Sequence, residues 1–133
     1  MLRLVAEANI ESATVLVADD DEMSVRLLMR ILEGAGFGRV LSTTDSTEVL
    51  GMVEREKPDL LVLDLAMPEP TGFEILEALK EIEGRPPTVV LSGHEHPAIA
   101  RQATELGAAA VLAKTTPREQ MVESFSAAIS SQD

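Results

Sequence analysis

The chain of 133 residues lacks cysteine, tryptophan and tyrosine, and aromatic residues make up only 2% of it. The absence of cysteine excludes disulfide bonds, thiolate chemistry and cysteine-ligated zinc, and it fits a reducing compartment such as the cytoplasm. Positive charge is also scarce, since 11 basic residues face 23 acidic ones and give a net charge of -12. This balance argues against a broad nucleic-acid interface and against docking on anionic lipid. We therefore expect a cytoplasmic protein with no direct nucleic-acid partner and no membrane partner.

Long apolar runs are missing too, because no stretch approaches the roughly 20 apolar residues that a membrane helix requires. Arg3 and Glu7 interrupt the first residues too early for a secretory signal. Hydrophobic residues nevertheless make up 45% of the chain, which is enough for one sizeable core. We expect a short N-terminal leader over residues 1–13, a single domain over residues 14–131 and a disordered tail at residues 132–133.

Short apolar runs alternate with segments of helical periodicity, and this alternation predicts βαβ units with a parallel sheet. The predicted strands are at about 14–18, 38–42, 59–64, 87–92 and 108–113, and the predicted helices at about 22–34, 46–57, 72–83, 97–106 and from Pro117 onward. Ser46 is a candidate N-cap of the second helix, while Gly34 and Gly36 are candidates for the end of the first. The six methionines and the three phenylalanines, including Phe73, are predicted to lie in the core.

Four of the predicted strands run into polar residues at their carboxyl ends. These residues are Asp19 and Asp20 after the first strand, Asp64 at the end of the third, Ser92 at the end of the fourth and Lys114 after the fifth. Two strand–helix units separate the first strand from the third. One unit separates the third strand from the fourth, and one separates the fourth from the fifth. Because the carboxyl ends of the strands in an open parallel sheet line one crevice, we expect these side chains to lie together.

Carboxylates gathered at one edge need a partner for their charge. Two carboxylates about 4 Å apart repel by roughly 1 kcal/mol in water and by about 4 kcal/mol at an effective dielectric constant of about 20. A shared proton or a cation removes this repulsion, and Mg²⁺ prefers oxygen ligands of this kind. A lysine can then bind a phosphoryl oxygen, and a serine can donate a hydrogen bond to another. A carboxylate in such a site can act as a nucleophile and become an aspartyl phosphate.

Four segments carry a resemblance to a known family. They are residues 15–22, residues 58–68 together with Gly72, residues 90–93 and residues 107–114. In this order and at this spacing they resemble the receiver domains of two-component response regulators, the CheY-like family, over nearly the whole chain. The resemblance implies an α/β fold of the flavodoxin-like (CheY-like) type, which is a doubly wound, five-stranded parallel sheet in the order 2-1-3-4-5 with five helices.

The resemblance also implies a role for each polar residue at the strand ends. Asp64 matches the phosphoacceptor, while Ser92 matches the switch hydroxyl and Lys114 the phosphate-binding lysine. The implied ligands of Mg²⁺ are Asp19, Asp20, Asp64 and the backbone carbonyl of Ala66. The implied function is that of a phosphoacceptor in two-component signal transduction, and not that of an enzyme.

Partners follow from the same resemblance. The donor would be a histidine kinase or a phosphotransfer protein, and a downstream protein or an output domain would receive the signal. The family's usual output face is formed by the fourth helix, the fifth strand and the last helix. Whether the chain forms a homodimer stays open, as does the identity of its kinase.

Two positions depart from the family's usual pattern. Thr115 follows the lysine where a proline is usual, and Val111 stands where many members carry an aromatic residue. Since the chain has no tyrosine or tryptophan, an aromatic rotamer switch coupled to Ser92 is not available in its usual form. Ala66 and His94 match positions at which members vary and tune dephosphorylation, so the lifetime of the phosphoryl group is not predicted.

Two other functions remain as alternatives. Asp19 and Asp21 after a strand would suit a Mg²⁺-dependent phosphatase with an aspartyl nucleophile, of the haloacid-dehalogenase type. However, Glu22 and Met23 follow where that group usually has a threonine or valine, and no acidic pair follows Lys114. A pseudo-receiver that only binds partners is the second alternative, and the complete set of polar residues argues against it.

The two histidines, His94 and His96, resemble a metal-binding pair. No third histidine exists to complete a zinc site, so exposed loop positions are the favoured interpretation. Asp21 is likewise expected to be exposed, and Thr71 to contribute to a turn.

Overall fold

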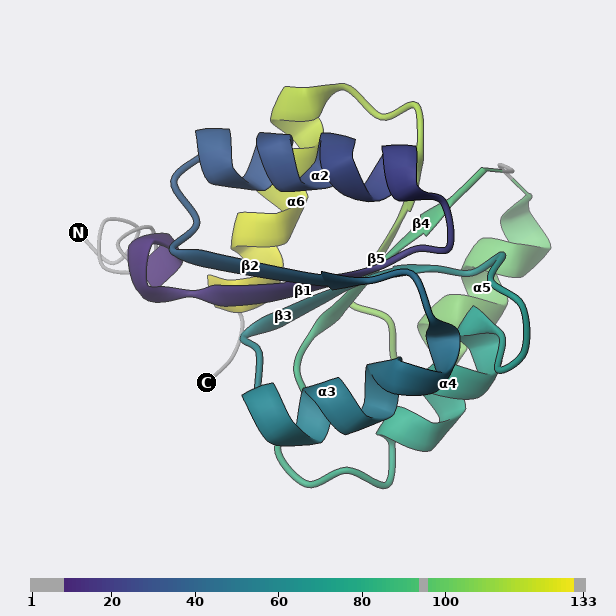
Figure 1. Cartoon of the computed structure of the whole chain (residues 1–133). Coiled ribbons are helices and arrows are strands. Elements are labelled where there is room, and N and C mark those ends of the chain that lie inside the picture. The colour runs from purple at the N-terminus through teal and green to yellow at the C-terminus, as the bar shows by residue number, and fades with distance from the viewer. Residues whose placement is uncertain (1–8, 94–95, 131–133) are drawn as a thin grey trace.

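The computed structural model describes residues 9–93 and 96–130 (Figure 1). The strands are β1 (Thr14–Ala18), β2 (Arg39–Thr43), β3 (Leu60–Asp64), β4 (Thr88–Ser92) and β5 (Ala110–Ala113). The helices are α2 (Glu22–Gly34), α3 (Val49–Glu56), α4 (Gly72–Leu79), α5 (Pro97–Glu105) and α6 (Arg118–Ser130), with the short 3-10 helices η1 (Asn9–Ser12) and η2 (Ser46–Glu48). Most of the predicted leader, the predicted tail and His94 lie outside the described residues. No helix within the described ranges is both long enough and apolar enough to cross a membrane.

The strands form one parallel sheet in the order β2-β1-β3-β4-β5, which confirms the predicted topology. Because β1 pairs with both β2 and β3, Ala18 lies beside Thr43 and Leu63 at the carboxyl end of these strands. Helices α2 and α6 cover one face of the sheet, and α3, α4 and α5 cover the other (Figure 1). This arrangement is the flavodoxin-like, doubly wound fold that the resemblance implies.

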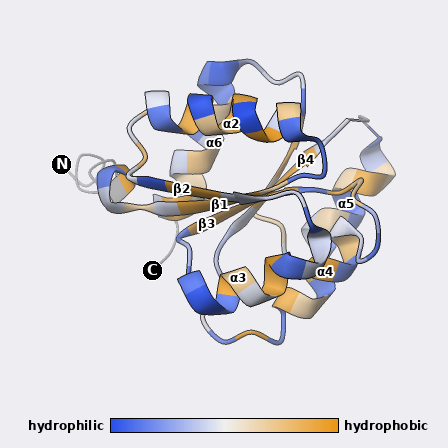
Figure 2. Ribbon diagram, in the orientation of Figure 1, coloured by the Kyte–Doolittle hydropathy of each residue, from blue (hydrophilic) through white to orange (hydrophobic). Residues whose placement is uncertain are grey.

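Alternate side chains of the strands pack into two separate cores. Val15 and Val17 of β1 pack in the core beneath α2 and α6, whereas Leu16 and Ala18 pack in the core beneath α3, α4 and α5. All four side chains are at most 1% exposed. Figure 2 shows hydrophobic strands enclosed by helices that also carry hydrophilic residues. Since both faces of the sheet are covered, polar groups collect where the strands end.

One predicted helix differs in its construction. The segment predicted at 46–57 consists of η2 followed by α3, and its first turn is capped by Asp45, which accepts a hydrogen bond from the backbone N–H of Thr47 (3.0 Å). The prediction that Ser46 caps this helix is therefore wrong. Its hydroxyl instead donates to the backbone carbonyl of Pro68 (2.8 Å), because the preceding aspartate already supplies the capping oxygen.

One prediction about the core is also wrong. Met23 is 76% exposed, because the buried stripe of α2 runs through Val25 and Leu28 on the opposite side of the helix. Phe73 is partly buried and packs against the core beneath α3, α4 and α5, while Ile75 of α4 is fully buried. The error at Met23 comes from judging a residue by its type, whereas the phase of the helix decides which side chains face the sheet.

The start of α4 is held tightly against the end of β3. Thr71 accepts a hydrogen bond from the backbone N–H of Glu74 (3.2 Å), and the Glu74 carboxylate accepts one from the N–H of Thr71 (2.8 Å), which forms a capping box. A Cβ on Gly72 would lie 2.5 Å from Leu65 Cα and 2.9 Å from the carbonyl oxygen of Asp64. Only a residue without a side chain permits this close approach.

Replacement of Gly72 by alanine is expected to lower the free energy of unfolding by about 1–3 kcal/mol, because the added methyl group pushes α4 away from β3. Gly51→Ala is the matched control, since a Cβ at this position of α3 meets no atom within 4 Å. The control should raise the free energy of unfolding by about 0.5–1 kcal/mol through helix propensity. Urea unfolding followed by far-ultraviolet circular dichroism measures both. Equal effects of the two substitutions would contradict a tight contact at Gly72.

Candidate functional site

Three acidic side chains meet at the carboxyl end of the sheet. Asp19 follows β1 directly and Asp64 is the last residue of β3, so the pairing of these neighbouring strands brings the two residues close. One carboxylate oxygen from each of Asp19, Asp20 and Asp64 lies within 4.8 Å of the other two. Asp19 and Asp64 are only 1% and 2% exposed, whereas Asp20 is exposed. The cluster therefore combines two buried carboxylates with one that is open to solvent.

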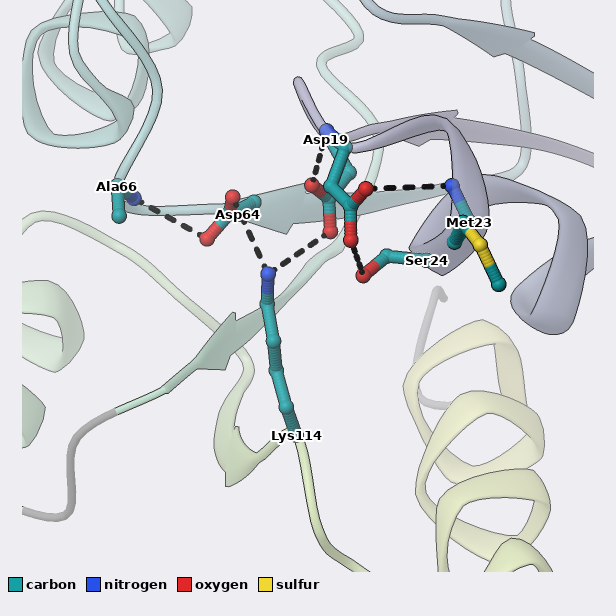
Figure 3. A network of polar contacts seen from close by, with 7 residues as sticks. Asp19, Met23, Ser24, Asp64, Ala66 and Lys114 are labelled. Carbon is teal, nitrogen blue, oxygen red and sulfur yellow. Dashed lines mark hydrogen bonds and ion pairs between the residues drawn. The ribbon is translucent and has the colours of Figure 1, made fainter.

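Backbone N–H groups hold both buried carboxylates. Oδ1 of Asp19 accepts a hydrogen bond from the N–H of Asp21 (2.9 Å). Oδ1 of Asp64 accepts one from the N–H of Ala66 (3.1 Å), as Figure 3 shows. The N–H of Asp19 itself donates to the carbonyl of Thr43 at the end of β2 (3.2 Å). The bonds from the N–H groups of Asp21 and Ala66 engage Oδ1 of each buried carboxylate and leave Oδ2 for other partners.

Lys114 places a positive charge beside the two buried carboxylates. Its Nζ lies 3.0 Å from Oδ2 of Asp19 and 3.3 Å from Oδ2 of Asp64 (Figure 3). The lysine follows β5, and its backbone N–H donates to the carbonyl of Ser92 at the end of β4 (2.9 Å). The structure thus brings three acids and one lysine from three different strand ends to one place.

The crowding of charges shifts two pKa values. Burial raises the pKa of the Asp64 carboxyl and the negative charge of Asp19 adds to this effect, while the N–H of Ala66 and the charge of Lys114 oppose it. Burial alone would lower the pKa of Lys114, but its contacts with Asp19 and Asp64 outweigh burial and raise the pKa. The lysine therefore stays charged, and the ionised form of Asp64 is favoured by any further positive charge at the site.

Negative charge exceeds positive charge at the site, which combines three acidic residues with one lysine. Oδ2 of Asp19 is buried, and its partner within the described residues is the Lys114 ammonium, which lies 3.0 Å away in an ion pair. A buried carboxylate oxygen is costly unless a donor or a cation contacts it. Mg²⁺ takes oxygen ligands and is typically held by one or two carboxylates together with water or phosphate oxygens. The residues present therefore fit a divalent cation of this class.

The family of the chain follows from its match to known sequences. Residues 15–126 match the response regulator receiver domain family. This chain belongs to that family. The resemblance inferred from the four sequence segments is thereby confirmed, and the acidic cluster lies where the receiver domain's strands end.

Curated relatives of this receiver domain include longer regulatory proteins. It is 33% identical over 122 residues to the sensory/regulatory protein RpfC of Xanthomonas campestris pv. campestris. This alignment covers 89% of this chain and 17% of RpfC. It is also 36% identical over 106 residues to PhoP of Bacillus subtilis, the alkaline phosphatase synthesis transcriptional regulatory protein. This alignment covers 79% of this chain and 44% of PhoP. The chain thus spans less than half the length of either relative.

Solved structures agree with the assignment. The signal receiver domain of NarL from Mycobacterium tuberculosis has a TM-score of 0.77 and 29% identity, and the alignment covers 84% of this chain and 90% of that one. A CheY-like receiver domain protein from Methanospirillum hungatei has a TM-score of 0.82 at 22% identity, covering 90% and 95% of the two chains. The second likeness bears on the fold alone.

Four other residues singled out in the sequence have defined positions in the receiver domain. Ser92 ends β4 and is 8% exposed. Ala66 is exposed at the turn after β3, and its N–H contacts the Asp64 carboxylate. Val111 is partly buried within β5, and Thr115 is exposed after Lys114. A small aliphatic side chain therefore stands at position 111 of β5.

Two residues have capping roles that the sequence pattern left unassigned. Asp21 is exposed, as expected. Its carboxylate also accepts hydrogen bonds from the hydroxyl of Ser24 (2.9 Å) and the N–H of Met23 (3.3 Å). These bonds cap α2 and lower the pKa of the Asp21 carboxyl. Nδ1 of His96 accepts a hydrogen bond from the N–H of Ala98 (3.2 Å) and caps α5. An aspartate directly before a helical segment was a usable signal for the first of these caps.

Mg²⁺ binding is expected to depend on Asp20. Asp20→Asn should weaken the affinity for Mg²⁺ by about tenfold or more, because one carboxylate charge leaves the cluster. Asp21→Asn removes the same charge from the next residue, keeps a good helix cap and should stay within about twofold of the parent. Isothermal titration calorimetry measures both affinities. An equal loss in the two variants would point to general charge attraction and against a ligand role.

Lys114 is expected to compete with the metal for the two buried carboxylates. Lys114→Gln should tighten Mg²⁺ binding by about tenfold, because a positive charge close to both Oδ2 atoms disappears. Lys80→Gln removes a lysine from the exposed end of α4 and should leave the affinity unchanged. The same titration calorimetry reports both values. A weaker affinity in Lys114→Gln would show that the lysine organises the carboxylates for the metal.

Proposed function

We propose that this receiver domain takes a phosphoryl group onto Asp64 from a histidine kinase or a phosphotransfer protein. The proposed Mg²⁺ ligands are Asp19, Asp20, Asp64 and the backbone carbonyl of Ala66. The position of the Asp64 carboxylate supports this proposal most directly. It is buried, it lies 3.3 Å from the Lys114 ammonium, and it shares a cluster with two further acids. A carboxylate with a cation beside it and a candidate metal site next to it suits phosphoryl transfer to a carboxylate.

The proposed reaction is a direct transfer from phosphohistidine. A carboxylate oxygen of Asp64 attacks phosphorus, the new phosphorus–oxygen bond forms, and the phosphorus–nitrogen bond to the donor breaks. The donor imidazole leaves with the electron pair of that bond. Lys114 offsets the charge on the phosphoryl oxygens, and the Ser92 hydroxyl donates a hydrogen bond to one of them. Bound Mg²⁺ would supply the remaining positive charge.

A phosphoryl group on Asp64 would also change the contacts of Lys114. New negative charge competes for the ammonium that now contacts Asp64 and Asp19. Because the N–H of Lys114 bonds to the carbonyl of Ser92, a shift of the lysine reaches the ends of both β4 and β5. These strand ends border the proposed output face, which consists of α5, β5 and α6. A tenfold change in partner affinity corresponds to about 1.4 kcal/mol between the two states.

The proposed output face has a feature that suits an apolar partner group. All four residues of β5 are only partly buried. A hollow of about 390 Å³ opens beside this strand, and its lining includes Ser92, Ile99 and Val111. A downstream protein, an attached output domain or a second copy of the chain would bind here. We further propose that signalling occurs in the cytoplasm through one domain over residues 14–131, with no direct contact to nucleic acid or membrane.

Acetyl phosphate with Mg²⁺ is expected to add one phosphoryl group to the parent protein and none to Asp64→Asn, since the variant has no carboxylate nucleophile. Asp21→Asn keeps the proposed site and should be modified like the parent. Intact-mass spectrometry reads the three products, and chelation of the metal should prevent the modification. Release of many equivalents of phosphate would support the phosphatase alternative instead. An unmodified parent would support a pseudo-receiver.

A further inference from the structure

The loop between β3 and α4 (residues 65–71) carries the backbone N–H group that contacts the Asp64 carboxylate. Its first part includes Ala66, whose N–H holds Oδ1 of the Asp64 carboxylate (3.1 Å). The two ends of the loop are joined, because the N–H of Gly72 donates to the carbonyl of Leu65 (3.3 Å). This joint does not by itself fix the middle of the loop, where the chain passes through Pro68.

A side chain from a different part of the sequence holds the middle of the loop. The Ser46 hydroxyl donates to the carbonyl of Pro68 (2.8 Å), and Ser46 is only 6% exposed. The hydroxyl is available for this contact because Asp45 caps η2 in its place. Ser46 thus ties the turn between β2 and α3 to the loop that follows the proposed phosphoacceptor.

The turn that carries Ser46 is itself anchored to the other acidic segment. The carbonyl of Thr43 accepts a hydrogen bond from the N–H of Asp19 (3.2 Å), and the Thr43 hydroxyl accepts one from the N–H of Asp45 (3.0 Å). Thr43 is 7% exposed, so this anchor lies inside the protein. The same turn therefore contacts the backbone at Asp19 on one side and the loop after Asp64 on the other.

We propose that Ser46 is a positioning residue for phosphoryl transfer to Asp64. Its hydrogen bond keeps the loop at Pro68 in place, and the loop in turn keeps the backbone of Ala66 aligned with the Asp64 carboxylate. The inference rests on the proposed function, because it assigns Ser46 an effect on the affinity for Mg²⁺ and on the rate of phosphorylation. Groups that orient metal ligands in this way change metal affinity by about tenfold or more when they are removed.

Ser46→Ala tests this role, and Thr47→Ala is its matched control. Thr47 lies next to Ser46 in η2 and is exposed, and its Oγ1 donates to Oδ1 of Asp45 (2.7 Å), away from the loop. Ser46→Ala is expected to weaken Mg²⁺ binding by about tenfold and to slow phosphorylation by acetyl phosphate by a similar factor. Thr47→Ala should stay within about twofold of the parent in both measurements. Ser46→Cys keeps the packing but offers a weak donor, and should show most of the same loss.

Amide hydrogen exchange adds a readout that a general loss of stability would not reproduce. In Ser46→Ala the amide of Ala66 should exchange faster, while amides in the centre of β1 keep their parent rates. Parent-like Mg²⁺ affinity and phosphorylation in both Ser46 variants would overturn the inference and leave the proposed function intact. A parent protein that neither binds Mg²⁺ nor accepts a phosphoryl group would overturn the proposed function, and this inference with it.

Discussion

The carboxylates of Asp19 and Asp64 are buried close together, and much of the site is arranged to offset the repulsion between them. Parallel pairing of β1 and β3 in the middle of the sheet brings them together, so the repulsion cannot be relieved by moving one residue without disturbing the core. The N–H groups of Asp21 and Ala66 and the ammonium of Lys114 each contribute positive charge. Acidic charge still exceeds basic charge at this place, which is the condition that favours a divalent cation.

Contacts around the two buried carboxylates connect the site to neighbouring helices and strands. The close approach of Gly72 to the end of β3 sets the start of α4, and the hydrogen bond from Ser46 holds the loop between them. On the other side, the N–H of Lys114 connects the site to Ser92 and so to the ends of β4 and β5. The site is therefore held by hydrogen bonds and close packing where the carboxylates lie. Lys114 connects the site to β5, and all residues of this strand are only partly buried.

Much of the architecture could be predicted from local sequence patterns, because buried parallel strands leave apolar runs with polar residues at their ends. β1 and α2 have the predicted bounds, and the other elements differ by a few residues. The order of the strands came from the resemblance to receiver domains and not from periodicity. The errors at Met23 and Ser46 share one cause. Each depends on which side of a helix or turn meets another part of the chain, and residue type does not contain that information.

By itself the sequence determined which chemical groups are available, and it placed them at strand ends. Asp19, Asp20, Asp64 and Lys114 are recognisable because each follows or ends an apolar strand of a repeating α/β pattern. Tertiary structure alone decided which atoms meet: that Lys114 contacts Oδ2 of both buried acids, and that Ser46 bonds to a carbonyl 22 residues away. Those contacts depend on side-chain direction across paired strands and loops. They are set by packing of distant segments, which no local pattern specifies.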